Sequence, residues 1–146
     1  MIPVTQTKVV VKNSNGEMVV RGNCFAAAIA SLMELPITEV PNVETLFDVE
    51  NVSWYDVMDA WIKDKGYQLT DNDAFMRAYH DKENECDIYD AKYCHNKYYI
   101  VTAMSPRGIM HCCIYQNGKM VHDPHPTREG IDEKTISQFE EIIKIS

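Results

Sequence analysis

Runs of hydrophobic residues at helical spacing predict two helices in the first half of the chain. The run Cys24–Met33 is rich in alanine and apolar on nearly every face, which is typical of a helix buried in the middle of a domain. Pro36 ends this helix, because the residue before a proline disfavours the helical conformation. Ser53 is a suitable N-cap for a second helix over Trp54–Lys65, which ends at Gly66.

Runs of β-branched and aromatic residues predict strands. Lys8–Val11 and Met18–Val20 flank the turn-forming residues Asn13–Gly16 and predict a hairpin. Part of Asp73–His80 is expected to be helical. Further strands are expected at Tyr67–Thr70, Tyr98–Met104, His111–Gln116, Lys119–His122 and Phe139–Ile145. This order predicts an α+β fold, with a central N-terminal helix packed on an antiparallel sheet, in a single domain over residues 1–146.

Composition narrows the classes of function. A formal charge of −8 argues against nucleic-acid binding and against an anionic membrane surface, since both need excess lysine and arginine. The N-terminus lacks the basic start and apolar stretch of a signal peptide, so a cytoplasmic location is expected. The chain has 5 cysteines, and an odd number cannot pair fully within one chain. We expect these thiols to be reduced, and therefore free, catalytic or metal-bound.

Cys24 stands where the first helix is expected to begin. A helix N-terminus concentrates unpaired backbone N–H groups and positive partial charge, and both favour the thiolate, which is the nucleophilic form. Gly22 lets the chain turn into the helix and leaves room for a substrate backbone. The backbone N–H of Cys24 could donate to an oxyanion. The alternative is a buried cysteine at the head of a core helix.

A base for Cys24 must titrate near neutral pH, which indicates a histidine on a rigid element. His111 opens a predicted strand and is our candidate, with a structural histidine as the alternative. Asp123, on the next predicted strand, would orient the imidazole. Together they would supply the nucleophile, the base and the orienting group of thiol catalysis.

The hairpin register decides whether Asp123 reaches the base. A three-residue loop, Gln116–Gly118, would place Asp123 opposite His111, and this is the register we expect. A two-residue turn at Asn117-Gly118 would instead place Pro124 opposite the base. His122 would then compete for the role of base.

Gln6 is the best side-chain candidate for a second oxyanion donor. It precedes the first predicted hairpin, which could fold out and leave Gln6 beside the head of the Cys24 helix. A surface glutamine is the alternative.

These residues resemble a known family. A Gln, a Cys at the head of a helix, a His at the start of a strand and an Asp in a Val-x-Asp-Pro stretch occur in this order in the bacteriocin-processing cysteine peptidases that cut after double-glycine leaders, within the papain-like group. Gln6, Cys24, His111 and Asp123 match these positions. The resemblance implies a papain-like fold and a Cys-His-Asp triad. The family usually has Cys-Gly-Pro-x-Cys at the helix head, whereas this chain has Cys24-Phe25-Ala26-Ala27-Ala28.

The segments Gly22–Phe25 and His122–Pro126 also resemble small uncharacterised proteins of tailed phages and bacteria. That resemblance implies a host-cytoplasm location for a phage-encoded protein. This second resemblance implies no activity. The resemblance to the leader peptidases implies a cysteine hydrolase that cleaves a peptide or isopeptide amide in a peptide or protein substrate. The sequence predicts no cofactor, and it leaves the oligomeric state open.

Three alternatives remain. One is an interaction protein on the same fold that binds and inhibits a host factor. Another is an acyltransferase of transglutaminase type that uses the same triad. The third is a structural zinc site, although no pair of ligands has zinc-finger spacing. Its potential ligands are Cys86, Cys94, His95, Cys112, Cys113, His122 and His125.

Overall fold

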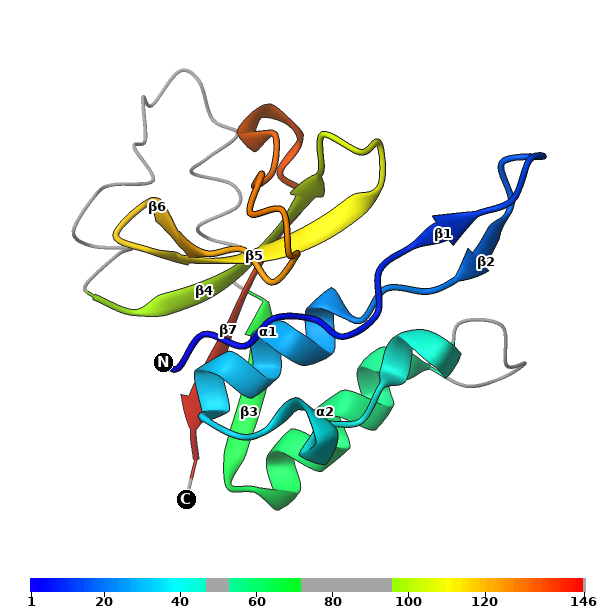
Figure 1. Ribbon diagram of the computed structural model, residues 1–146. Helices are drawn as coiled ribbons and strands as arrows, with labels where there is room; N and C mark the ends of the chain where they lie inside the picture. The colour runs from blue at the N-terminus through cyan, green and yellow to red at the C-terminus, as the bar shows by residue number, and fades with distance from the viewer. Residues whose placement is uncertain (47–52, 72–95, 146) are drawn as a thin grey trace. The chain divides into compact units, whose positions relative to one another are not determined.

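The structure is a computed structural model that describes residues 1–46, 53–71 and 96–145 (Figure 1). These residues fall into two compact units. The first unit comprises Met1–Gln68, Pro124–Thr127 and the C-terminal end from Lys144. The second comprises Leu69–Asp123 and Arg128–Ile143. The single domain over residues 1–146 stays a prediction, and each unit is described by itself.

Helix α1 (Cys24–Met33) forms the centre of the first unit, as the sequence predicts. Every residue from Phe25 to Ser31 is buried, because the run is apolar on all faces. The helix ends where Glu34 adopts a left-handed conformation, with φ 57°. The N-terminal segment runs alongside α1 (Figure 1), where Ile2 N donates to the Ser31 carbonyl at 3.0 Å.

The first hairpin is shorter than predicted. It consists of β1 (Val11–Lys12) and β2 (Met18–Val20), so the expected strand from Lys8 is only partly formed. Lys8 does not continue the strand because its N–H donates to Asn23 Oδ1 at 2.9 Å, and its carbonyl accepts from Asn23 N at 3.1 Å.

Helix α2 (Trp54–Asp64) follows two short 3₁₀ turns, η1 (Ile37–Glu39) and η2 (Val43–Leu46). Ser53 caps α2 as predicted, since its hydroxyl accepts from Asp56 N at 3.3 Å. The aromatic rings of Phe25 and Trp54 meet edge to face with centroids 5.1 Å apart. This contact packs α2 against α1. No helix in the described parts of the chain is long and apolar enough to cross a bilayer.

A five-stranded sheet dominates the second unit, in the order β3-β7-β4-β5-β6. The neighbours β4–β5, β4–β7 and β5–β6 pair antiparallel. The α+β class is therefore confirmed. The strands are β3 (Tyr67–Asp71), β4 (Tyr98–Met104), β5 (Met110–Gln116), β6 (Lys119–His122) and β7 (Gln138–Lys144).

Both faces of the central strands are buried, since Val101 and Cys113 on one face and Ile100 and Ile114 on the other are all 0% exposed. A third 3₁₀ turn, η3 (Glu133–Thr135), precedes β7. The helix expected within Asp73–His80 lies outside the described residues.

Candidate active site

In the first unit, the residue before the candidate nucleophile organises the head of α1. Asn23 is buried and occupies the N-cap position, but its side chain makes no capping hydrogen bond to the helix. Instead, its Oδ1 accepts from the backbone N–H groups of Thr7 at 3.0 Å and Lys8 at 2.9 Å. Its Nδ2 donates to the Thr7 hydroxyl at 2.8 Å. The N-terminal segment is thereby fixed to the residue that precedes Cys24.

Gln6 lies beside this helix head, as the sequence predicts. Its side chain is buried, and its Nε2 donates to the Lys8 carbonyl at 2.7 Å. A Cβ placed on Gly22 would lie 3.2 Å from the same Nε2. The space beside Gly22 is thus filled by Gln6, which corrects our expectation that the glycine leaves room there for a substrate backbone. An amide nitrogen carries two N–H groups, so the role of Gln6 as an oxyanion donor stays a prediction.

Glu44, on η2, is a neighbour of Cys24 that the sequence did not indicate. Its Oε1 accepts from Phe25 N at 2.9 Å and from Ala26 N at 3.1 Å. The carboxylate therefore caps α1 from a distant part of the chain. No capping motif relates residues this far apart, so only the tertiary structure could show this contact.

In the second unit, His111 and Asp123 form a buried pair. The His111 Nε2 lies 2.6 Å from the Asp123 Oδ1, and the side chains are 5% and 0% exposed. The other carboxylate oxygen of Asp123 accepts from Gly130 N at 2.7 Å, and its backbone carbonyl accepts from the Arg128 guanidinium. Asp123 is thus held at three atoms, and it orients the imidazole.

The register that produces this pair differs from the one we expected. The turn consists of two residues, because Gln116 pairs with Lys119. A register shift follows, and Ile114 pairs with His122 in place of Val121. The three-residue loop was therefore wrong.

The shift decides which side chain faces the imidazole. Continuing the pairing by one residue puts Asp123 opposite Cys113, on the face that also carries His111. His122 shares the other face with Ile114, so it does not compete for the role of base on the His111 face.

Cys113 is a third member of this group. One ligand atom each from His111, Cys113 and Asp123 lies within 4.8 Å of the others, so these residues could in principle hold a metal ion. Both carboxylate oxygens of Asp123 already accept hydrogen bonds. Burial raises the pKa of the Cys113 thiol, although the nearby imidazole partly opposes this effect. The donor set therefore fits poorly, because a metal needs the thiolate.

Burial has a second consequence for the thiols of β5. Cys112 and Cys113 are 3% and 0% exposed, so both are packed as small hydrophobic side chains. A buried thiol with a raised pKa is a poor nucleophile. Of the other potential zinc ligands, Cys86, Cys94 and His95 lie outside the described residues.

No protein-family model, curated protein or solved structure matches the chain. The papain-like assignment stays a prediction that depends on the residues named above.

Proposed function

We propose that the protein is a cysteine hydrolase in which Cys24 is the nucleophile, His111 the base and Asp123 the group that orients the base. The observation that carries the proposal is the buried 2.6 Å contact between His111 Nε2 and Asp123 Oδ1. A carboxylate that is itself anchored by Gly130 N fixes the tautomer of the imidazole, with the proton on Nε2. The basic lone pair is then on Nδ1, the nitrogen that would receive the thiol proton.

The first unit supports the same proposal. Cys24 is the first residue of α1 and is partly exposed, whereas Cys112 and Cys113 are buried. A thiol must be both accessible and ionisable to act as a nucleophile. Cys24 therefore suits the role better than either cysteine of β5.

The chemistry follows from these roles. The Cys24 thiol gives its proton to His111 Nδ1, and the sulfur attacks the carbonyl carbon of an amide. The tetrahedral oxyanion is stabilised by the Cys24 backbone N–H and by Gln6. The C–N bond then breaks, the amine takes the proton from His111, and a thioester remains. Water attacks the thioester and restores the thiol. If an amine attacks instead, the reaction is acyl transfer.

Site-resolved alkylation tests the pairing of Cys24 with His111. The full-length chain is treated with iodoacetamide across the pH range, and the alkylation rate of each cysteine is followed by peptide mass mapping. We expect Cys24 in the wild type to react at least about tenfold faster near neutral pH than Cys24 in His111→Ala, because an imidazolium stabilises its thiolate. His122→Ala, a change on the opposite face of the sheet, should leave the rate of Cys24 intact, and the buried Cys112 and Cys113 serve as slow internal references in every chain.

The outcomes separate the alternatives. If the alkylation rate of Cys24 is the same in the wild type and in His111→Ala, or if Cys24 reacts as slowly as the buried thiols, the hydrolase proposal fails. If the advantage is present, a mixed fluorogenic peptide library distinguishes hydrolysis from amine transfer by the product formed. An interaction protein would show neither product, and Cys24→Ala would leave its binding unchanged.

A further inference from the structure

The carboxyl of Glu44 lies at the head of α1, so this end of the helix carries two groups that can ionise to anions, the Glu44 carboxyl and the Cys24 thiol. The Glu44 Oε1 accepts two hydrogen bonds, from the N–H groups of Phe25 and Ala26 at 2.9 and 3.1 Å. These are the residues that directly follow Cys24. The positive end of the α1 dipole is thus shared between a carboxylate and a thiol.

Apart from Cys24, the charged groups near Glu44 have hydrogen-bond or ion-pair partners or are exposed to solvent. Asn42, with its amide oriented to satisfy both neighbours, donates to Glu44 Oε2 at 3.1 Å and accepts from the Lys8 ammonium at 3.2 Å. On α2, which packs against η2, Asp59 is paired with Lys63 at 2.8 Å, and Asp56 is exposed. On α1 the ionisable group near Glu44 is Cys24.

The carboxyl of Glu44 is poised to change charge near neutral pH. Burial raises its pKa from 4.5 to about 7, and repulsion from the Cys24 thiolate adds to this rise against the lowering effect of the backbone hydrogen bonds. The repulsion is reciprocal. The Cys24 thiolate makes Glu44 harder to ionise, and the Glu44 carboxylate makes the Cys24 thiol harder to ionise by the same free energy.

We propose that Glu44 is a positioning residue that restrains the ionisation of Cys24, so that the carboxylate and the thiolate compete for the head of α1. Its relevance to hydrolysis depends on the function proposed above. Ionised Glu44 keeps the thiol protonated, and protonation of Glu44 releases this restraint. Its two hydrogen bonds to the helix keep it close enough for this coupling.

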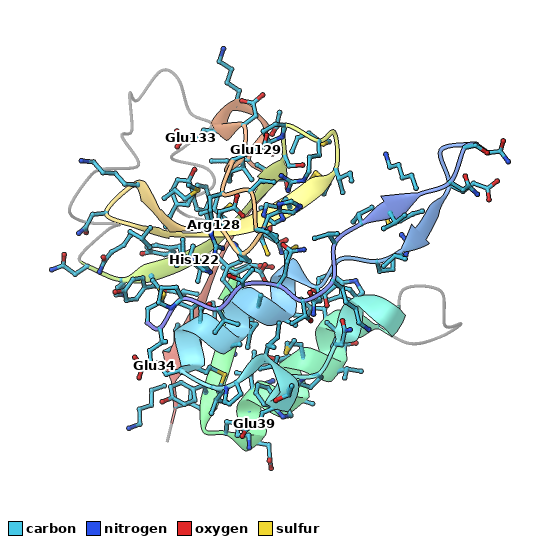
Figure 2. All side chains as sticks on the ribbon, viewed as in Figure 1. Glu34, Glu39, His122, Arg128, Glu129 and Glu133 are labelled. Atoms are coloured by element: carbon cyan, nitrogen blue, oxygen red, sulfur yellow. The ribbon has the colours of Figure 1, made fainter. Side chains whose placement is uncertain are left out.

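The substitution Glu44→Gln tests the proposal. Glutamine retains an oxygen that can accept from Phe25 N and Ala26 N, but it carries no charge. We expect the midpoint of the Cys24 alkylation profile to move to lower pH by about one unit, which makes alkylation below the midpoint about tenfold faster. The matched control is Glu39→Gln, since Glu39 lies on the exposed surface of η1 (Figure 2) and its loss should leave the midpoint unchanged.

A second measurement applies to a chain with Glu44 intact. The carboxyl of Glu44 is titrated by carbon NMR in the wild type and in Cys24→Ser, which removes the ionisable thiol. By reciprocity the midpoint of Glu44 should fall in the variant. Unchanged midpoints in both experiments would make Glu44 a helix cap alone and would overturn the proposal.

The two proposals can fail separately. The alkylation of Glu44→Gln is repeated in the His111→Ala background, where no thiolate–imidazolium pair can form. A downward shift in that background supports the restraint by Glu44 even if no hydrolysis is found. An advantage of Cys24 that depends on His111, without any shift in Glu44→Gln, supports the hydrolase and contradicts the restraint.

Discussion

Asp123 is the residue on which the second unit's candidate chemistry depends. It is buried and accepts hydrogen bonds at both carboxylate oxygens, from His111 and from Gly130 N. Gly130 has φ +80°, and a Cβ there would lie 3.3 Å from the sulfur of Met120. A side chain at that position would be strained, so the glycine is needed to bring its N–H to the carboxylate.

The contact between His111 and Asp123 should contribute to the free energy of unfolding as well as to the chemistry of the site. Asp123→Ala leaves a buried imidazole and the Gly130 N–H without their acceptor, and we expect it to lower the free energy of unfolding by about 3 kcal/mol. In a double-mutant cycle with His111→Ala, measured by urea unfolding, we expect a coupling of about 1–3 kcal/mol. Additive effects of the two substitutions would contradict an energetic pair in solution.

At the scale of residues, the sequence predicted which side chains form the His111–Asp123 pair better than it predicted the contacts around the candidate nucleophile. His111 and Asp123 were selected by residue chemistry together with an expected hairpin register and a family resemblance. The two side chains do meet, although the register that was expected to bring them together was wrong. The contact of Glu44 with α1 could not be found in the same way. It joins residues separated by a loop, and only packing determines where that loop returns.

At the scale of elements, one extra residue in β6 determines which side chain reaches His111. Without the shift at Val121, continued pairing would bring His122 to the face of His111, because side chains alternate along a strand. With the shift, Asp123 occupies that face. The irregular pairing is therefore part of the candidate site.

Deletions in β6 test this role of the register. Deletion of Val121 removes the extra residue, so regular pairing still puts His122 opposite Ile114 and Asp123 on the face of His111, and we expect the alkylation rate of Cys24 to stay at the wild-type level. Deletion of both Met120 and Val121 would put Asp123 on the face of Ile114, and it should reduce the alkylation rate of Cys24 to the level seen in His111→Ala. Val121→Ala is the matched control, since it keeps the extra residue and removes only an exposed side chain. A chain without Met120 and Val121 that folds and keeps the fast reaction of Cys24 would show that the register of β6 does not select the orienting group.

Physical reasons explain which helices, strands and turns were predicted correctly and which were not. Helices α1 and α2 begin at the predicted residues because alanine-rich periodicity and the Ser53 cap are local signals. The strands β4, β5, β6 and β7 were predicted to within a residue or two. The loop between β5 and β6 was wrong, because Asn117 and Gly118 both adopt positive φ, at 52° and 75°, in a two-residue turn. The compensating shift at Val121 is a tertiary effect with no local signal.

At the scale of the whole molecule, acidic groups exceed basic ones and some of them are buried. The chain carries a formal charge of −8. Glu140 on β7 is only 2% exposed, and its Oε2 has no hydrogen-bond partner among the described residues. Burial, with a further contribution from the Asp71 carboxylate, raises the pKa of Glu140 from 4.5 to about 7. Such a group makes the free energy of unfolding depend on pH.

The direction of that dependence follows from the raised pKa. The folded chain holds the Glu140 proton more tightly than the unfolded chain does, so the contribution is fully present below about pH 4.5 and is lost as the pH rises through about 7. We expect the free energy of unfolding of the wild type to fall across this window, with on the order of 3 kcal/mol due to Glu140. Glu44 contributes in the same direction, since its pKa is raised to about 7 as well.

Glu140→Gln isolates the share of this one residue, because glutamine imitates the neutral carboxyl at every pH. Urea unfolding measured from pH 4.5 to 8 should show the variant gaining stability over the wild type as the pH rises, with the largest difference above pH 7. Glu141→Gln is the control: it removes a carboxyl from the next residue of β7, which points to the other face of the sheet, and leaves Glu140 in place. If Glu140→Gln differs from the wild type by a constant amount across the range, then Glu140 is ionised in the folded chain, and a cation that neutralises it must be sought around β7.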